Sequence, residues 1–111
     1  MNLSGSVFNN FSANIAGTAV NLTIDSSNSS SYNGSVCTLA NAITITLDAS
    51  LPNGFTITFL QLTSNQTTFT GSGGLVIGNR QGHTKNNGLY SVVSVVKITN
   101  VLAILGGDTA A

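Results

Sequence analysis

Charged side chains are almost missing from this sequence. They make up 5 % of its 111 residues, whereas a typical soluble domain has about 25 %. Glutamate is absent, and the net charge at neutral pH is zero. The charged residues are Asp25, Asp48, Asp108, Arg80, Lys85 and Lys97. Three cations cannot neutralise the ~6–10 phosphates of a typical nucleic-acid site, so we expect no nucleic-acid partner.

The residues that carry most enzyme and metal chemistry are equally scarce. The single histidine, His83, and the single cysteine, Cys37, cannot build a tetrahedral zinc site or an intramolecular disulfide within one chain. Three scattered aspartates without glutamate do not suit the paired carboxylates of glycosidases. We therefore expect no cofactor, no metal and no enzymatic activity. A small hydrolase is the remaining enzymatic alternative.

Long apolar segments are missing as well. No run approaches the ~18 apolar residues of a membrane-spanning helix. The start of the chain also lacks the basic and apolar regions of a signal peptide. We expect the protein to be made and folded in a cytosol, with no membrane partner.

Neutral polar residues take the place of the missing charges, beside 41 % apolar residues. A hydroxyl or amide costs about 1–3 kcal/mol to bury, whereas an unpaired charge costs several kcal/mol. Net charge also keeps free monomers apart, and this chain has none. The composition favours a protein that works inside an assembly. The alternative is a secreted monomer with a hydroxyl-rich surface.

Alternation of apolar and polar residues predicts β-strands along most of the chain. Segments 42–47 (AITITL) and 55–62 (FTITFLQL) alternate strictly, and the DASLPNG between them has turn residues. We expect these two segments to form a hairpin. Further strands are expected at 67–71, 75–77 and 101–105. Short strands with regular turn signals predict an all-β fold, a single-domain antiparallel β-sandwich or small barrel.

Segment 89–98 (LYSVVSVVKI) is apolar on both faces. A strand of this kind lies in the centre of a sheet or against another subunit. Val92, Val93, Val95 and Val96 are therefore candidate residues of the core or of a subunit interface.

The first forty residues are less regular. Strands are expected at 20–24 and 35–39, and the low-complexity DSSNSSSYNG between them predicts a loop. Residues 1–17 have weak periodicity and are expected to order only on a partner. We expect residues 1–40 to form an N-terminal arm with strands that anchors the protein, and residues 41–111 to form the β-sandwich module.

The stretch GNRQGHTKNNG at 78–88 gathers His83 with two of the three cations. A histidine base needs a carboxylate to orient it and a nucleophile within reach. This stretch contains no acid, and the nearby Ser91 shows no nucleophile elbow. We interpret the stretch as a loop on a rigid β scaffold, with Arg80, His83 and Lys85 as candidate partner-contact residues.

Threonines at outward positions of the two alternating strands suggest a further alternative. Thr44, Thr46, Thr56 and Thr58 would form rows like those of ice-binding proteins. Threonine is also simply favoured on half-exposed strands. Ordinary strand propensity is the simpler interpretation.

A series of short motifs follows from residue 42 onward. They are LPNGF at 51–55, GHTK at 82–85, GLYS at 88–91 and GD at 107–108. In this order and spacing, the last two-thirds of the chain resembles a β module of tailed-bacteriophage virion structural proteins. The chain departs from that module in the apolar VLAIL before the closing GD, where the module carries a Trp.

The resemblance implies a component of the virion surface or tail, trimeric and without enzymatic activity, made in the cytoplasm of the host bacterium. The forty residues before the module favour a capsid decoration (cement) protein or a short head fibre, in which residues 1–40 would hold the capsid. Its partners would be copies of itself and the major capsid protein. The alternative is a receptor- or glycan-binding module of a tail fibre or spike, with a host surface glycan as partner.

Overall fold

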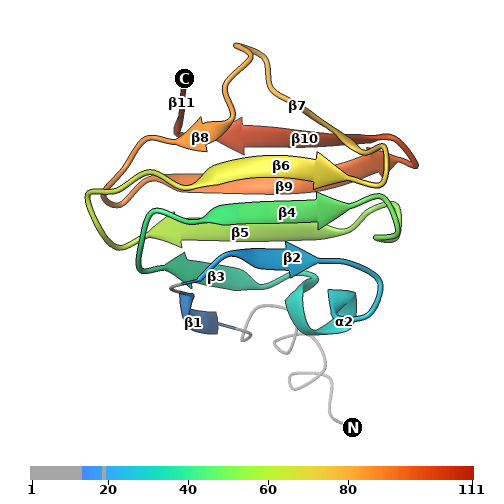
Figure 1. Cartoon of the computed structure of the whole chain (residues 1–111), viewed down its shortest axis with the longest axis horizontal. Helices are drawn as coiled ribbons and strands as arrows, with labels where there is room; N and C mark the ends of the chain where they lie inside the picture. Colours follow the sequence, from blue (N-terminus) through green and yellow to red (C-terminus); the bar gives the residue numbers. More distant parts are fainter. Residues whose placement is uncertain (1–13, 19) are drawn as a thin grey trace, which may run out of the picture.

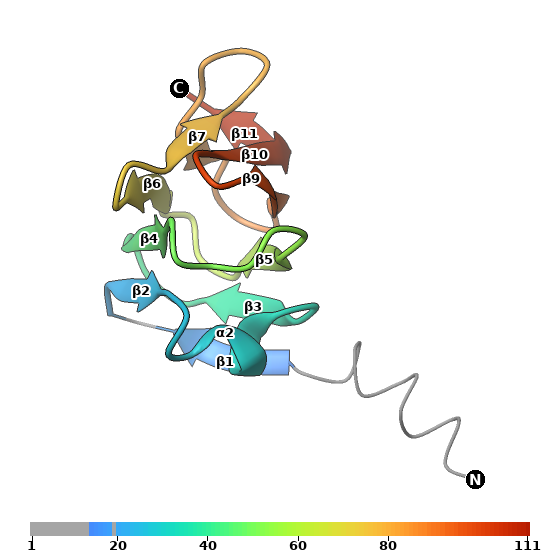
Figure 2. The same cartoon turned by 90° about the vertical axis from the view of Figure 1, so that its right-hand side faces the viewer.

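The chain folds into two β-sheets packed face to face (Figure 1 and Figure 2). The computed structural model describes residues 14–18 and 20–111. The six-stranded sheet has the order β1 (Asn14–Thr18), β3 (Val36–Leu39), β5 (Thr56–Gln61), β9 (Val92–Thr99), β10 (Leu102–Gly107) and β7 (Val76–Gly78). The five-stranded sheet has the order β11 (Thr109–Ala110), β8 (Lys85–Asn86), β6 (Thr68–Ser72), β4 (Thr44–Asp48) and β2 (Leu22–Ile24). The expected all-β sandwich is confirmed.

Successive strands alternate between the two sheets from β1 to β8. Strands β2, β4 and β6 run in one direction, and β3 and β5 run in the other (Figure 1). Each of these strands therefore runs parallel to the strand two positions before it, which lies in the same sheet. Strands β1, β3 and β5 pair in parallel in one sheet, and β2, β4 and β6 pair in parallel in the other. Among the described strands, the antiparallel pairing expected from the sequence is confined to β5–β9, β9–β10, β6–β8 and β8–β11.

The prediction that segments 42–47 and 55–62 form a hairpin is wrong. Strand β4 lies in the five-stranded sheet and β5 in the six-stranded sheet. The connection between them crosses the end of the sandwich, where it buries Leu51 and Phe55, and Gly54 takes a φ of 88°. Alternation shows which side of a strand is buried. It does not show which strand lies beside it.

A true hairpin joins β9 and β10. It is inserted into the six-stranded sheet between β5 and β7, so that β7 pairs in parallel with β10. Strand β9 is thus central in its sheet, which agrees with its apolar residues on both faces.

The residues before position 40 share the two sheets with the rest of the chain. Strand β2 pairs with β4, and β3 pairs with β5. The expected loop between β2 and β3 contains a single helical turn, α2 (Ser29–Tyr32). No boundary near residue 40 separates these strands from the expected module. Residues 1–13 of the expected arm lie outside the described residues, and its anchoring role stays a prediction.

The core fills the space between the sheets. Phe59 of β5 and Phe69 of β6 meet there with ring centroids 5.1 Å apart. The buried apolar side chains are Ile24, Cys37, Leu39, Ile43, Ile45, Leu47, Leu51, Phe55, Ile57, Phe59, Phe69, Leu75, Val93, Val95, Ala103 and Leu105.

Polar side chains are also buried at both ends of β5. Near its start, Lys97 is 2 % exposed, and its Nζ donates a hydrogen bond of 2.8 Å to Oδ1 of Asn53. Near its end, the Oε1 atom of Gln61 accepts from the Asn86 amide and the Thr67 hydroxyl, both at 2.8 Å. This second group ties the two sheets together with neutral groups whose hydrogen bonds are made, which makes the position of each strand more specific.

Candidate functional site

The outer face of the six-stranded sheet carries no charge. Within its six strands, Lys97 is the only aspartate, glutamate, lysine, arginine or histidine, and its side chain is buried on the core side. Charged side chains of both signs, spread over a protein surface, usually oppose unwanted association. A solvent-facing sheet without any charge is therefore a candidate interaction surface.

Large apolar side chains are exposed across this face. They come from β3, β7, β9 and β10, so they span the sheet from one side to the other. They are Val36, Val76, Val92, Val96, Ile98 and Ile104, each between 37 % and 59 % exposed. The strand register places Val96 directly between Thr56 and Ile104. The exposed apolar side chains of β9, β10 and β7 are thus neighbours across three adjacent strands, whereas Val36 is separated from them by Thr58 and Ser94.

Two polar side chains on the same face are satisfied within the chain. The hydroxyl groups of Thr58 and Ser94, which are paired in register, hydrogen-bond to each other at 2.9 Å. A polar group that already has a partner loses little when water is removed, whereas an unpaired one costs about 1–3 kcal/mol. Covering this face would therefore be inexpensive.

The four valines expected in the core or an interface divide between the two roles. Val93 and Val95 point into the core and are at most 1 % exposed. Val92 and Val96 point outward, with 48 % and 37 % of their surface exposed. One strand thus contributes to the core and to the candidate interaction surface on alternate residues.

Tyr90 marks one end of this surface, and sequence reasoning did not single it out. It is 71 % exposed and has a φ of 63°, which is unusual for a bulky residue. Its backbone N–H donates to the carbonyl of Gln61 at 2.8 Å. Leu62 and Leu89 are exposed as well. The strained backbone presents an aromatic ring to solvent, as binding sites often do.

The outer face of the five-stranded sheet is different, because threonines lie side by side on neighbouring strands. The register aligns Thr23, Thr46 and Thr70 in one row across three parallel strands, and pairs Thr44 with Thr68 in a second row. The prediction that Thr44, Thr46, Thr56 and Thr58 share rows on one face is wrong. Thr56 and Thr58 belong to the six-stranded sheet, because β4 and β5 do not form the expected hairpin.

The loop that begins at Gly78 is held in one shape by the side chain of Asn79. Its Oδ1 atom accepts the backbone N–H groups of Gln81 and His83 at 2.9 and 3.0 Å, and its Nδ2 atom donates to the carbonyl of Leu105 at 2.9 Å. Nδ1 of His83 lies 3.0 Å from the hydroxyl of Thr109.

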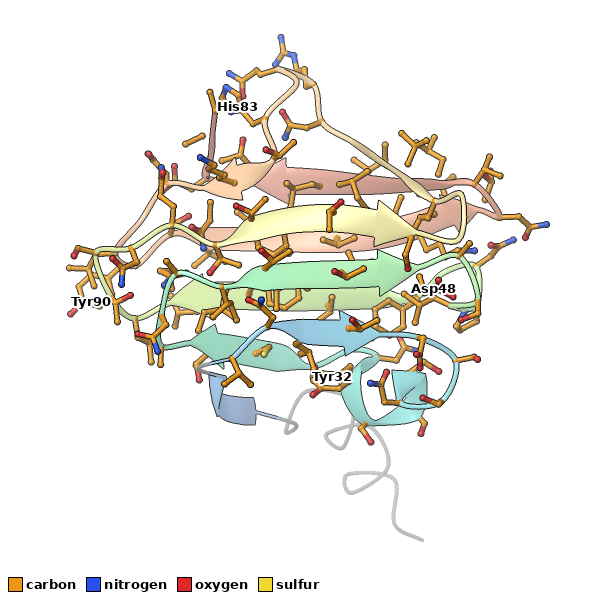
Figure 3. All side chains as sticks on the ribbon, viewed as in Figure 1. Tyr32, Asp48, His83 and Tyr90 are labelled. Atoms are coloured by element: carbon orange, nitrogen blue, oxygen red, sulfur yellow. The ribbon has the colours of Figure 1, made fainter. Side chains whose placement is uncertain are left out.

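The three candidate partner-contact residues are not equivalent. Arg80 is exposed at the loop, His83 is half-buried beside Thr109, and Lys85 belongs to β8, opposite Ala110 and Thr68. Figure 3 shows His83, Asp48 and Tyr90 in three separate parts of the molecule. The structure therefore does not bring the histidine together with either of these two ionisable side chains.

We expect His83→Ala to lower the free energy of unfolding by only about 1 kcal/mol, because it removes one partly exposed hydrogen bond. Asn79→Ala removes four hydrogen bonds and should cost clearly more. Denaturant unfolding of the two variants measures the difference. Loss of self-association in the His83 variant would instead place the loop in an interface.

Two of the motifs that carry the resemblance meet in space. The hydroxyl of Ser91, in GLYS, donates to the backbone carbonyl of Asp108, in GD, at 2.6 Å and accepts from the N–H of Asn87 at 3.0 Å. A Cβ atom on Gly107 would lie 2.5 Å from the carbonyl oxygen of Val92. These motif residues hold the end of β10 against the start of β9, which is a structural role.

Asp48, at the end of β4, has the most perturbed carboxylate among the described residues. Its oxygens accept from the hydroxyl of Ser72 at 2.7 Å and from the backbone N–H of Ser50 at 3.0 Å. The hydroxyl of Ser50, then that of Ser72, lower the pKa of Asp48 from 3.8 to about 2. The folded state therefore favours ionised Asp48.

The folded protein should lose the contribution of Asp48 as the pH falls from 3.8 to about 2 and keep it fully above that range, because its pKa is lower in the folded than in the unfolded state. Ser72→Ala should raise the pKa of Asp48, measured by an NMR titration of its carboxyl carbon. Asp48→Asn should remove this part of the pH dependence of unfolding. An unchanged titration in the Ser72 variant would contradict the assigned cause.

A hollow opens beside the start of β5. It is lined by Asn33, Gly34, Ser35, Val36, Gly54, Thr56, Ile57 and Thr58, which include neither charged nor aromatic side chains. The described residues also contain no group of three or more His, Cys, Asp or Glu side chains placed to bind a metal ion. None of the described helices has the length and hydrophobicity needed to cross a membrane.

Comparison with models of known protein families, with curated proteins and with solved structures finds no match to this chain. The resemblance to the bacteriophage β module, and the trimer it implies, therefore stay predictions.

Proposed function

We propose that this chain is a non-enzymatic structural component of a bacteriophage virion, most simply a decoration (cement) protein or short head fibre on the capsid. The uncharged outer face of the six-stranded sheet carries this proposal. An exposed surface of this kind suits permanent contact with other proteins. On this proposal the protein acts as a homotrimer that also contacts the major capsid protein.

A receptor- or glycan-binding module of a tail fibre is the second candidate. The loop after Gly78 favours it, because Asn79 holds an exposed Arg80 on a rigid scaffold away from the apolar face. Binding residues are often presented on such loops.

Quantitative mass spectrometry of virus particles purified from cells that produce this protein tests both candidates. A copy number close to that of the major capsid protein supports a decoration protein, whereas one close to that of the tail proteins supports a tail module. Absence from the particles, or hydrolysis of a host polysaccharide by the purified chain, would overturn the proposal.

A further inference from the structure

We infer that the outer face of the six-stranded sheet packs against a second copy of this chain, with Gly106 at the point of closest approach. This inference names the partner of the surface on which the proposed function rests. The inference and the proposed function can be tested separately, because the inference depends only on the geometry of this chain.

The absence of charge makes this face compatible with itself. Two copies of a charged surface repel each other, and a partner of opposite charge then fits better. Here the six strands expose no charge, and the only hydroxyl pair across β5 and β9, Thr58 with Ser94, is already hydrogen-bonded. A second copy can therefore meet this face, directly in a dimer or around a threefold axis in a trimer, without like-charge repulsion and without leaving that pair unsatisfied.

None of the residues that the structure describes explains why position 106 is a glycine. A Cβ atom there would have no neighbour within 4 Å, and its φ lies outside the left-handed region. By contrast, a Cβ atom on Gly71 or Gly107 would collide with backbone atoms. Glycine inside a strand is destabilising by about 0.5–1 kcal/mol and often marks the close approach of another backbone. Gly106 lies on the exposed side of β10, opposite Ser94.

The area of the face is at the lower limit for self-association. Six strands ~4.8 Å apart, with eight residues at ~3.3 Å each in the longest, give at most about 25 by 25 Å, or about 600 Å², because the other five strands have three to six residues. Two such faces would bury about 1,200 Å² in total, the lower end of the ~1,200–2,000 Å² of stable interfaces. The exposed Leu62 and Tyr90, beyond the ends of β5 and β9, add apolar surface of the kind that often dominates binding.

Light scattering coupled to size-exclusion chromatography, performed on the purified full chain, tests this inference. We expect the wild-type protein to have a mass of two or more 11.3 kDa chains. Val96→Lys places a charge in the centre of the face, and Gly106→Leu fills the point of closest approach. Each should weaken self-association by about tenfold or more. Thr70→Lys, on the outer face of the other sheet, is the matched control and should leave the mass unchanged.

Circular dichroism shows whether each variant is folded, and Gly106→Leu should fold because its added atoms point into open space. A monomeric wild-type protein, or folded Val96 and Gly106 variants that associate as the wild type does, would overturn the inference. A monomer that is nevertheless incorporated into virus particles would leave the proposed function standing and assign this face to another virion protein. A multimer that is missing from virus particles would support this inference and overturn the proposed function.

Discussion

Replacing Ile57 by Asp is expected to abolish folding. Ile57 lies in the middle of β5, opposite Val95, and is 1 % exposed. The carboxylate would be buried among apolar side chains without a partner, at a cost of several kcal/mol added to the lost apolar contacts. A domain of this size is stable by only about 5–15 kcal/mol. Far-ultraviolet circular dichroism and thermal unfolding measure the result, which should be the loss of a cooperative transition.

Thr46→Asp is the control for this substitution. Thr46 is half-buried on the outer face of the five-stranded sheet, where water reaches its side chain. The variant should fold and unfold cooperatively. If Ile57→Asp folded equally well, β5 would not have the orientation described above.

Gly71→Ala is expected to be the most damaging change of a single methyl group. A Cβ atom at this position would lie 2.0 Å from the carbonyl oxygen of Leu75 and 2.9 Å from its carbonyl carbon. Because both are backbone atoms, the end of β6 must move, and Ser72 would move with it away from Asp48. We expect a loss of at least ~2 kcal/mol and a melting temperature lower by roughly 10 °C or more.

Gly106→Ala provides the matched comparison, since the same methyl group enters open space. At protein concentrations low enough to keep both proteins monomeric, its unfolding should resemble that of the wild type or improve slightly, because alanine restricts the unfolded chain. Equal stability of the Gly71 and Gly106 variants would show that the turn after β6 is not as tightly closed as described.

Much of the strand content could be predicted from local pattern. The strands expected at 20–24, 35–39, 42–47 and 55–62 overlap the observed elements β2 to β5, and only β4 extends one residue beyond its expected segment. Their partners could not be predicted. The same alternation fits antiparallel and parallel sandwiches, because both have one face in the core and one face outside.

The candidate interaction surface was only partly foreseeable. The apolar residues of segment 89–98 indicated a strand with two covered faces, and Val92 and Val96 are indeed exposed on one of them. Tyr90 and the buried group around Gln61 gave no such signal. The exposure of the Tyr90 ring depends on the conformation of a turn. Gln61 contacts Asn86 only because the chain crosses from one sheet to the other.

The sequence by itself determined two properties of this protein: the side of each strand that faces the core, and a surface with almost no charge. Both follow from composition and from the two-residue period of a strand, which are local. The tertiary structure alone decided the rest, namely which sheet each strand joins and the collection of exposed apolar residues from β3, β7, β9 and β10 on one face. These features depend on where each turn directs the chain, and strand alternation carries no information about that direction.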